Sequence, residues 1–263
     1  MKRIAMTVSC ALVVAAVLHS APTIAAEWGN LSGTFVFDGD PPAAKMPVLD
    51  TDAAYCGKFG VVDESLVVGK DGGLKNVFVY LYLATGEKPP EPHESYAETE
   101  TAEVVLDNLK CRFEPHAVIV RTTQTVVLGN KDTVGHNTKI DPLNNNPINP
   151  LIPAGGSLKH QFTETERLPA KVGCNIHKWM GAWILVRDNP YFAVTDEEGK
   201  FAIKNLPAGE WTFQVWQEQA GYLQDVKLDG KATAWRRGRF TVTIEPGDND
   251  LGKILVAPEV FEK

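Results

Sequence analysis

The sequence predicts an all-β protein built from β-sandwiches, and two observations support this fold class. Short segments rich in β-branched and aromatic residues recur along the chain, separated by Gly, Asp or Pro, which is typical of strands joined by turns. No segment after the first 26 residues shows a long run of apolar residues at helical spacing. Regularly spaced strands with turn residues between them favour a sandwich or a barrel.

Six strands are expected in the first part of the chain. The segment NVFVYLYL has apolar side chains at both odd and even positions, so both faces of this strand should be buried. The Pro-rich loops at residues 86–101 and 141–153 should lie on the surface. The expected strands cover residues 33–37, 65–69, 76–83, 103–107, 117–120 and 125–130.

A second block of strands begins near Pro190, where apolar and polar residues alternate between the turn sequences DEEGK and LPAGE. The pattern TD-x-x-G-x-F-x-I-x-x-L-P-A-G-x-W, which begins at Thr195, resembles small β-sandwich domains of the carboxypeptidase regulatory-like type. This resemblance implies a smaller C-terminal β-sandwich with a structural role. We therefore expect two domains, at residues 27–189, with N-terminal extension strands, and at residues 190–263.

Residues 1–26 have the features of a secretory signal peptide. Lys2 and Arg3 precede an apolar stretch, and small residues near Ala26 offer a cleavage site. Such a leader directs the protein to the periplasm or out of the cell. No later segment approaches the ~18 apolar residues that a membrane-spanning helix needs, so we expect no integral membrane segment.

The chain is acidic, with 26 Lys and Arg residues against 33 Asp and Glu residues and a formal net charge of −7. Loss of Lys2 and Arg3 with the leader makes the mature charge −9. This balance argues against a nucleic-acid partner, because nucleic-acid binding depends on basic surface. The acidity either steers a basic protein partner or, as we favour, only keeps the protein soluble.

The stretch CNIHKWM combines three side chains that bind metals, because Cys174, His177 and Met180 follow one another at intervals of three. Thiolate and thioether sulfurs are soft ligands, so this set suits copper better than magnesium or calcium. Structural zinc sites use Cys and His rather than Met. His136, which lies 38 residues before the cysteine, offers a second imidazole. The alternative is a buried free cysteine beside a surface histidine, with the methionine in the core.

The motif N-K-D-x-x-x-H-N, which ends at Asn137, together with C-x-x-H-x-x-M resembles the ligand loops of the cupredoxin, or type 1 blue copper, family. The gaps of two residues are most similar to amicyanin, whereas plastocyanins usually have a longer gap between His and Met. The run from the cysteine through DNPYFAVTD resembles exported cupredoxin-domain proteins associated with methylamine utilisation. The resemblance implies a Greek-key β-sandwich as the first domain.

The resemblance also implies one mononuclear copper site. His136, Cys174 and His177 would be the three close ligands, and Met180 would be the long axial ligand. Asn137 would tie the two ligand loops together by hydrogen bonds, which is the support that such a site needs.

The function implied by the resemblance is outer-sphere one-electron transfer to a redox protein partner, for example a c-type cytochrome. His177, on an exposed loop, is the expected exit point of the electron. No substrate bond is made or broken in this function, so we expect that the protein is not an enzyme. Two alternatives stay open: a copper-binding module that stores, senses or delivers the ion, and an exported structural β-protein that a bound metal stabilises.

Cys56 and Cys111 are the remaining cysteines of the mature chain, and we expect a disulfide between them. The bond would leave Cys174 free for a metal and would stabilise the fold by ~4 kcal/mol in the chain-entropy model. Two unpaired buried thiols are the alternative, which is less common in an exported protein. His116 is either an accessory metal ligand or, as we favour, a structural residue held by hydrogen bonds.

Overall fold

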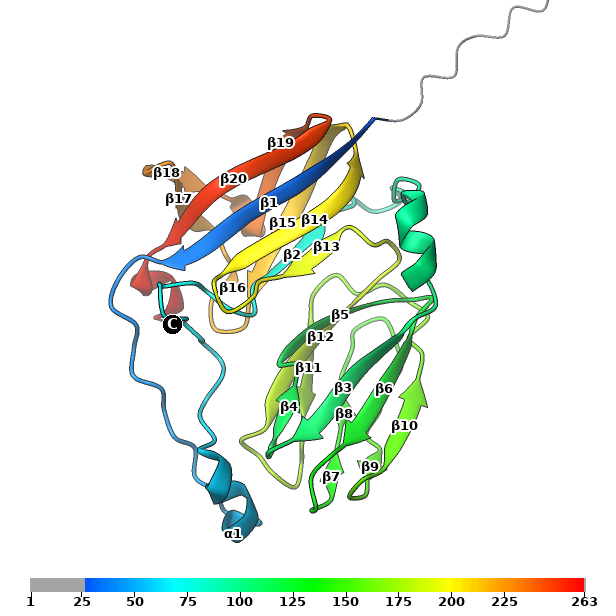
Figure 1. The fold of residues 1–263 in the computed structure, drawn as a ribbon, viewed down its shortest axis with the longest axis vertical. Helices are drawn as coiled ribbons and strands as arrows, with labels where there is room; N and C mark the ends of the chain where they lie inside the picture. The colour runs from blue at the N-terminus through cyan, green and yellow to red at the C-terminus, as the bar shows by residue number, and fades with distance from the viewer. Residues whose placement is uncertain (1–26, 263) are drawn as a thin grey trace, which may run out of the picture.

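The computed structural model describes residues 27–262, and it confirms the expected all-β class. Strands make up most of the regular structure, and the helices of the described residues are short. The strands form two β-sandwiches, which lie one above the other in Figure 1. The expected signal peptide at residues 1–26 lies outside the described residues. Within the described part of the chain, no helix is long and apolar enough to cross a membrane.

The first sandwich, which lies in the lower half of Figure 1, contains two four-stranded sheets and a small two-stranded one. One sheet holds β10 (Ser157–His160), β6 (Thr125–Asn130), β3 (Glu103–Leu109) and β4 (Arg112–Glu114), in that order. The other holds β5 (Ala117–Arg121), β12 (Gly181–Arg187), β11 (Ala170–Gly173) and β8 (Lys139–Ile140). The small sheet pairs β7 (His136–Asn137) with β9 (Leu151–Ile152).

The apolar core of the first sandwich reaches the predicted metal-ligand loop. Leu106, Leu128 and Ile184 are fully buried between the two larger sheets. Cys174 and Met180 belong to the same buried cluster. Two residues of the predicted site are therefore part of the apolar core of the first sandwich.

The second sandwich also has two sheets, with its core around residues such as Phe35, Val79 and Phe213. One sheet has the order β14 (Lys200–Pro207), β1 (Trp28–Phe37), β20 (Gly247–Val256), β17 (Asp225–Leu228) and β18 (Lys231–Ala234). The other has the order β13 (Phe192–Val194), β2 (Phe78–Leu81), β15 (Gly209–Gln217) and β16 (Gly221–Tyr222), and β19 (Arg239–Ile244) pairs with β15.

The strand pairing corrects the predicted division into residues 27–189 and 190–263. The strand β1 lies between β14 and β20, and β2 lies between β13 and β15, so both complete the second sandwich. Alternate residues of β1 are buried along its whole length, because one face of this strand packs on the core of the second sandwich. Its neighbours lie more than 160 residues away, and alternation alone does not identify such distant partners.

The expected strand at residues 65–69 is also corrected, because this segment makes only one isolated bridge, between Val68 and Leu74. Part of its backbone is instead held by a side chain: Gln217 Nε2 donates to the carbonyl oxygen of Ser65 at 2.6 Å. Its β-branched residues therefore reflect packing against the second sandwich rather than membership of a sheet.

The two sandwiches meet through an apolar contact. Phe78 and Tyr80 of β2 and Trp216 of β15 pack against Ile119 of β5 and Leu185 of β12. This explains why both faces of the NVFVYLYL segment are apolar, as expected: the odd positions pack into the core of the second sandwich, and Phe78 and Tyr80 form this contact.

The chain between β1 and β2 leaves the second sandwich and runs down to the far end of the first (Figure 1). There it forms α1 (Ala53–Cys56) and η1 (Gly57–Phe59), and a disulfide joins Cys56 to Cys111, which confirms the predicted bond. We call residues 52–60 the cap segment. The remaining 3-10 helices are η2 (Glu94–Thr99), η3 (Arg236–Gly238) and η4 (Pro258–Phe261).

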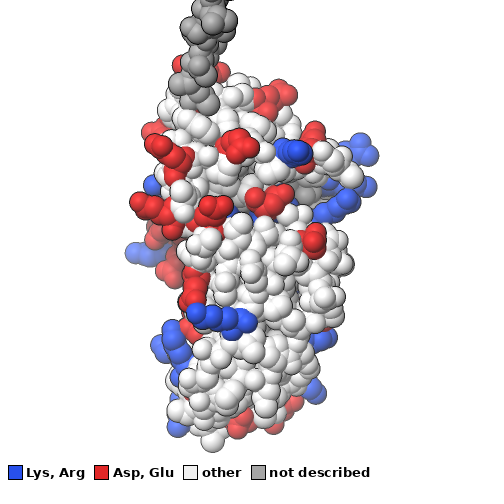
Figure 2. All heavy atoms as spheres, turned by 90° about the vertical axis from the view of Figure 1, so that its right-hand side faces the viewer, with Lys and Arg blue, Asp and Glu red and all other residues white. Residues whose placement is uncertain are grey.

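Charged side chains are unevenly spread over the face that Figure 2 displays. Acidic and basic residues are interspersed over the second sandwich, at the top of the view. The first sandwich, seen from the side of β6 and β10, carries a broad surface with few charges. Any electrostatic steering of a partner on this side of the molecule would therefore act mainly through the second sandwich.

A fragment of residues 190–263 should not fold on its own. It lacks β1 and β2, and each of these strands is central in a sheet, so the core residues of both sheets would stay exposed. We expect a collapsed amide region in a proton–nitrogen NMR spectrum, and a dispersed spectrum from residues 27–263. A dispersed spectrum from the short fragment would show that the second sandwich does not need the N-terminal strands.

Candidate metal centre

The candidate ligands come from two neighbouring loops at one end of the first sandwich. His136 begins β7, which pairs with β9. Cys174 directly follows β11, and the loop that it opens closes at Gly181, the partner of Gly173 in the last pair of the β11–β12 hairpin. Inside this loop the amide of Met180 donates to the carbonyl oxygen of His177 at 2.9 Å.

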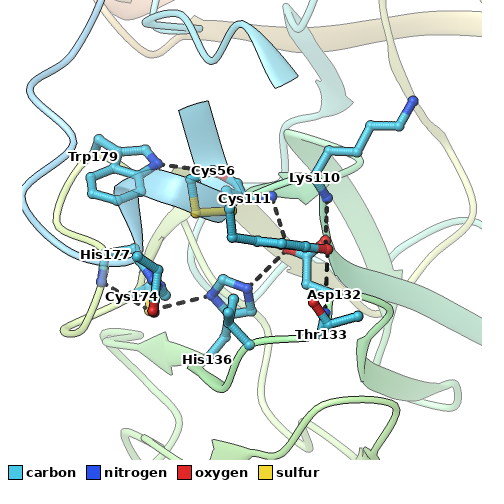
Figure 3. Close-up of a disulfide and its surroundings, with 12 residues drawn as sticks. Cys56, Lys110, Cys111, Asp132, Thr133, His136, Cys174, His177 and Trp179 are labelled. Carbon is cyan, nitrogen blue, oxygen red and sulfur yellow. Dashed lines mark hydrogen bonds and ion pairs between the residues drawn. A yellow bond between two sulfur atoms is a disulfide. The ribbon is translucent and has the colours of Figure 1, made fainter. Parts of the chain in front are cut away.

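The structure brings three of the four predicted residues into one buried cluster (Figure 3). The sulfur of Cys174 lies 4.0 Å from Nδ1 of His136 and 3.7 Å from Nδ1 of His177. The two histidines are 0% exposed and the cysteine is 5% exposed. Met180, the fourth, is also buried, in the same apolar cluster as the cysteine.

Each imidazole is held from behind by a carboxylate. Nε2 of His136 lies 3.0 Å from Oδ2 of Asp132, and Nε2 of His177 lies 3.0 Å from Oδ2 of Asp52. A carboxylate accepts a hydrogen bond from Nε2–H, so each ring takes the tautomer whose Nδ1 carries a lone pair. Both lone pairs then face the sulfur, as in the carboxylate–histidine–metal arrangement of protein metal sites.

Asp132 is fixed by the turn between β3 and β4. The amides of Lys110 and Cys111 donate to its two carboxylate oxygens at 2.6 and 2.8 Å. Both residues have positive φ, 54° and 57°, which is the backbone of a tight hairpin turn. Tyr55 of the cap segment adds a hydroxyl contact to the same carboxylate at 3.2 Å. The carboxylate therefore has little freedom, and it fixes His136 in turn.

Burial favours the neutral form of His136, which is the form that a free Nδ1 lone pair requires. It lowers the pKa of His136, and the neighbouring His177 lowers it further, against the opposing effect of Asp132. The ring is therefore neutral near pH 7, and a neutral imidazole is the form that binds metals.

Asp52, on the cap segment, is a site residue that the sequence did not reveal. It occupies the N-cap position of α1, but its side chain makes no capping hydrogen bond, and its backbone is left-handed, with φ 48° and ψ 31°. Asp at this position usually caps the helix, and a left-handed backbone is uncommon for residues other than Gly. The carboxylate instead reaches His177, 125 residues away in sequence. An outlier of this kind points to a functional constraint.

Asn137 links the two ligand loops, as expected. Its Oδ1 accepts hydrogen bonds from the amides of Asn175 at 2.8 Å and Ile176 at 3.3 Å. The same oxygen lies 3.4 Å from the sulfur of Cys174. The loop that carries the cysteine is therefore tied to the loop that carries His136.

The expectation that His177 is exposed is wrong. Asp52 covers one edge of its ring, and the indole of Trp179 packs against it, with 5.1 Å between ring centroids. Trp179 is itself held by a hydrogen bond from Nε1 to the carbonyl oxygen of Cys111, at 3.1 Å. The cap segment and the tryptophan therefore cover the face of the site that the sequence left open to solvent.

The cluster fits a soft metal ion. Bond lengths of about 2.0–2.1 Å for nitrogen and about 2.3 Å for sulfur put the donors of one shared ion about 3.6–3.8 Å apart, and the shorter of the two sulfur–nitrogen distances, 3.7 Å, lies in this range. The two nitrogen lone pairs and the sulfur face one point, and a cation between them would be stabilised by all three. A second group, Cys111, Asp132 and His136, has similar spacing, but Cys111 is in the disulfide and offers no thiolate.

His116 does not join either group of potential ligands among the described residues. Its Nε2 lies 2.7 Å from Oε2 of Glu218, and its Nδ1 lies 3.9 Å from Oε2 of Glu64. These contacts agree with the structural role that the sequence favoured over an accessory metal ligand.

Comparisons with known proteins give only partial similarities. No protein-family model matches the chain, and no curated protein matches it. A Cu-containing nitrite reductase from Thermus scotoductus is 22% identical, and the match covers 40% of this chain and 24% of that one, with a TM-score of 0.30. An amicyanin variant in its Cu(I) form is 23% identical over 32% of this chain and 82% of its own, with a TM-score of 0.29. A purple cupredoxin from Nitrosopumilus maritimus is 24% identical over 32% and 98%, with a TM-score of 0.27.

These similarities correct one expectation. We expected that the protein is not an enzyme, but the similar structures include a nitrite reductase, which is an enzyme, beside amicyanin. That expectation is therefore withdrawn. The TM-scores are all far below 0.5, so these similarities do not determine the chemistry of the site.

Removing the Asp52 carboxylate should abolish the preference of His177 for the tautomer that is protonated at Nε2. In the metal-free protein the Nε2–H form should predominate, and in Asp52→Ala the Nδ1–H form should rise to a comparable population, because no acceptor then selects the Nε2 proton. Long-range proton–nitrogen NMR distinguishes the two forms. Asp50→Ala removes an exposed carboxylate two residues away and is the matched control. An unchanged tautomer in Asp52→Ala would contradict the role assigned to this residue.

Proposed function

We propose that the protein is an exported type 1 copper protein that transfers single electrons. The observation that supports this function is the convergence of two carboxylate-held imidazoles and one thiol at a buried point. His136, Cys174 and His177 would be the close ligands of one mononuclear copper, and Met180 the distant fourth. Copper in such a set supplies a reversible Cu(II)/Cu(I) couple.

The residues around the site suit electron transfer because they hold the ligands in place before the ion binds. Asp132 and Asp52 fix the two rings, and Asn137 fixes the cysteine loop. A rigid ligand set changes little between two oxidation states, so little reorganisation opposes the transfer of an electron. Burial also excludes water from the thiolate, which protects it from oxidation.

Trp179 gives the buried site a route to the surface. Its ring is partly exposed, and it packs against His177. We infer that an electron passes through this contact to a redox protein, for which a small c-type cytochrome is a suitable test partner. The disulfide supports the periplasm or the cell exterior as the location, because such bonds persist in oxidising compartments.

Copper storage or delivery is the second candidate, and one observation favours it. Both histidines are 0% exposed, and the cap segment covers the edge of His177, so a bound ion would exchange slowly with solution. Fast reduction of a c-type cytochrome by the Cu(I) form favours electron transfer. Slow electron exchange combined with transfer of Cu(I) to an acceptor protein favours storage or delivery.

Addition of Cu(II) to residues 27–263 should produce an intense visible thiolate-to-copper band. Cys174→Ser should abolish the band, because it removes the thiolate. Met180→Leu should shift the band and raise the reduction potential, because the axial ligand tunes this type of site. Met46→Leu, a substitution of a methionine that is 78% exposed, is the control and should change neither. A band of equal intensity in Cys174→Ser, or no band in the unsubstituted protein, would contradict the proposal.

A further inference from the structure

A cavity of about 410 Å³ lies between the two sandwiches, beside their apolar contact. Arginines from both sandwiches line it, namely Arg167 and Arg187 from the first and Arg237 and Arg239 from the second. A volume of several hundred Å³ is typical of sites for small molecules. Four guanidinium groups around one cavity are unexpected in a chain with a net charge of −7.

The sheet that contains β2, β15 and β19 positions several of the residues that line this cavity. Gln214 of β15 is in register with Tyr80 of β2 on one side and with Arg239 of β19 on the other. Residues in register point to the same face of a sheet, and all three line the cavity. The guanidinium carbon of Arg239 lies 3.5 Å from the centre of the Tyr82 ring, so the arginine is held in place without a carboxylate.

These arginines have no acidic partner within the described residues, where no ion pair involves any of the four. Arg187 donates to the backbone carbonyl oxygens of Glu166 and Leu81, at 3.0 and 2.9 Å. Arg167 donates to a threonine hydroxyl at 3.3 Å. All three acceptors are neutral.

Two of the guanidinium groups also contain a buried N–H group that makes no hydrogen bond. Nε of Arg187 and Nε of Arg239 have no hydrogen-bond partner, although Arg187 is only 7% exposed. A buried donor without an acceptor is unfavourable, and a buried cation without a counter-ion is more so. Burial lowers the pKa of Arg187, and the nearby Asp188 carboxylate opposes this effect only in part.

The two carboxylates in the lining do not balance the four arginines. Glu87 accepts a hydrogen bond from the amide of Ala84 at 2.6 Å, and Asp188 accepts one from the side chain of Asn189 at 2.9 Å. Each acid is therefore engaged within its own loop. The cavity keeps an excess of two positive charges, which a ligand with two negative charges would neutralise.

We propose that this cavity binds a small oxyanion, a phosphate or a di- or tricarboxylate, through the guanidinium groups that line it. Arg239 is the principal candidate, because among the described residues its guanidinium group contacts only the face of the Tyr82 ring. Guanidinium groups match the oxygens of both classes by paired hydrogen bonds. Tyr80, Tyr82 and Tyr222 give the cavity apolar walls for the carbon skeleton of an organic anion. A bound anion would join arginines of the two sandwiches and stabilise their arrangement. This site is separate from the proposed copper centre and does not depend on it.

Binding should be measured on residues 27–263 by isothermal titration calorimetry, with inorganic phosphate and citrate as probes at constant ionic strength. We expect saturable binding of at least one probe, together with a rise in melting temperature, because a ligand that binds only the folded state stabilises it. Binding of citrate alone would identify a carboxylate ligand, and binding of phosphate a phosphate ligand; both outcomes support the site.

Arg239→Gln should weaken the binding by roughly tenfold or more, the loss that corresponds to one hydrogen bond between charged groups. Arg236→Gln removes an exposed arginine that does not line the cavity, and it should leave the affinity unchanged. The melting temperature of each variant without ligand checks that it folds. Equal affinity in Arg239→Gln and Arg236→Gln, or no binding of either probe at millimolar concentration, would overturn the proposal.

Discussion

The hydrogen bond between a carboxylate and the rear nitrogen of each histidine is the contact on which the candidate site depends. An imidazole has only two ring nitrogens, so fixing Nε2 commits Nδ1 to the other direction. Asp132 and Asp52 do this for His136 and His177, and both free nitrogens then face the sulfur of Cys174. Without these two carboxylates, no hydrogen bond to Nε2 would orient either ring so that its Nδ1 faces the sulfur.

The path of the chain makes this convergence possible. Its first strand belongs to the second sandwich, so the chain must travel to the first sandwich and return before β2. The cap segment lies on that excursion, and the bond between Cys56 and Cys111 holds it beside the turn that anchors Asp132. One disulfide thus stands next to the supports of both histidines, and the protein covers its own site with sequence that lies far from the ligands.

The sequence predicted the parts of the site that are local in the chain. Cys174, His177 and Met180 lie within one loop, and soft ligands at that spacing indicate copper without knowledge of the fold. Asp52 could not be predicted, because nothing near it in sequence links it to His177 except the disulfide expected at Cys56. Similarly, the alternation in β1 predicted a strand but not its neighbours. The arginines of the cavity between the sandwiches come from β12, β19, η3 and the loop before β11. Contacts of this kind depend on tertiary structure, which short patterns do not encode.

A crystal structure of the copper-loaded protein, with anomalous scattering measured at the copper edge, tests the central claim most directly. The account predicts a single strong peak within about 2.0–2.3 Å of Nδ1 of His136, the sulfur of Cys174 and Nδ1 of His177, with both Nε2 atoms still on Asp132 and Asp52. A peak bound through Nε2, or a peak away from Cys174, would contradict it.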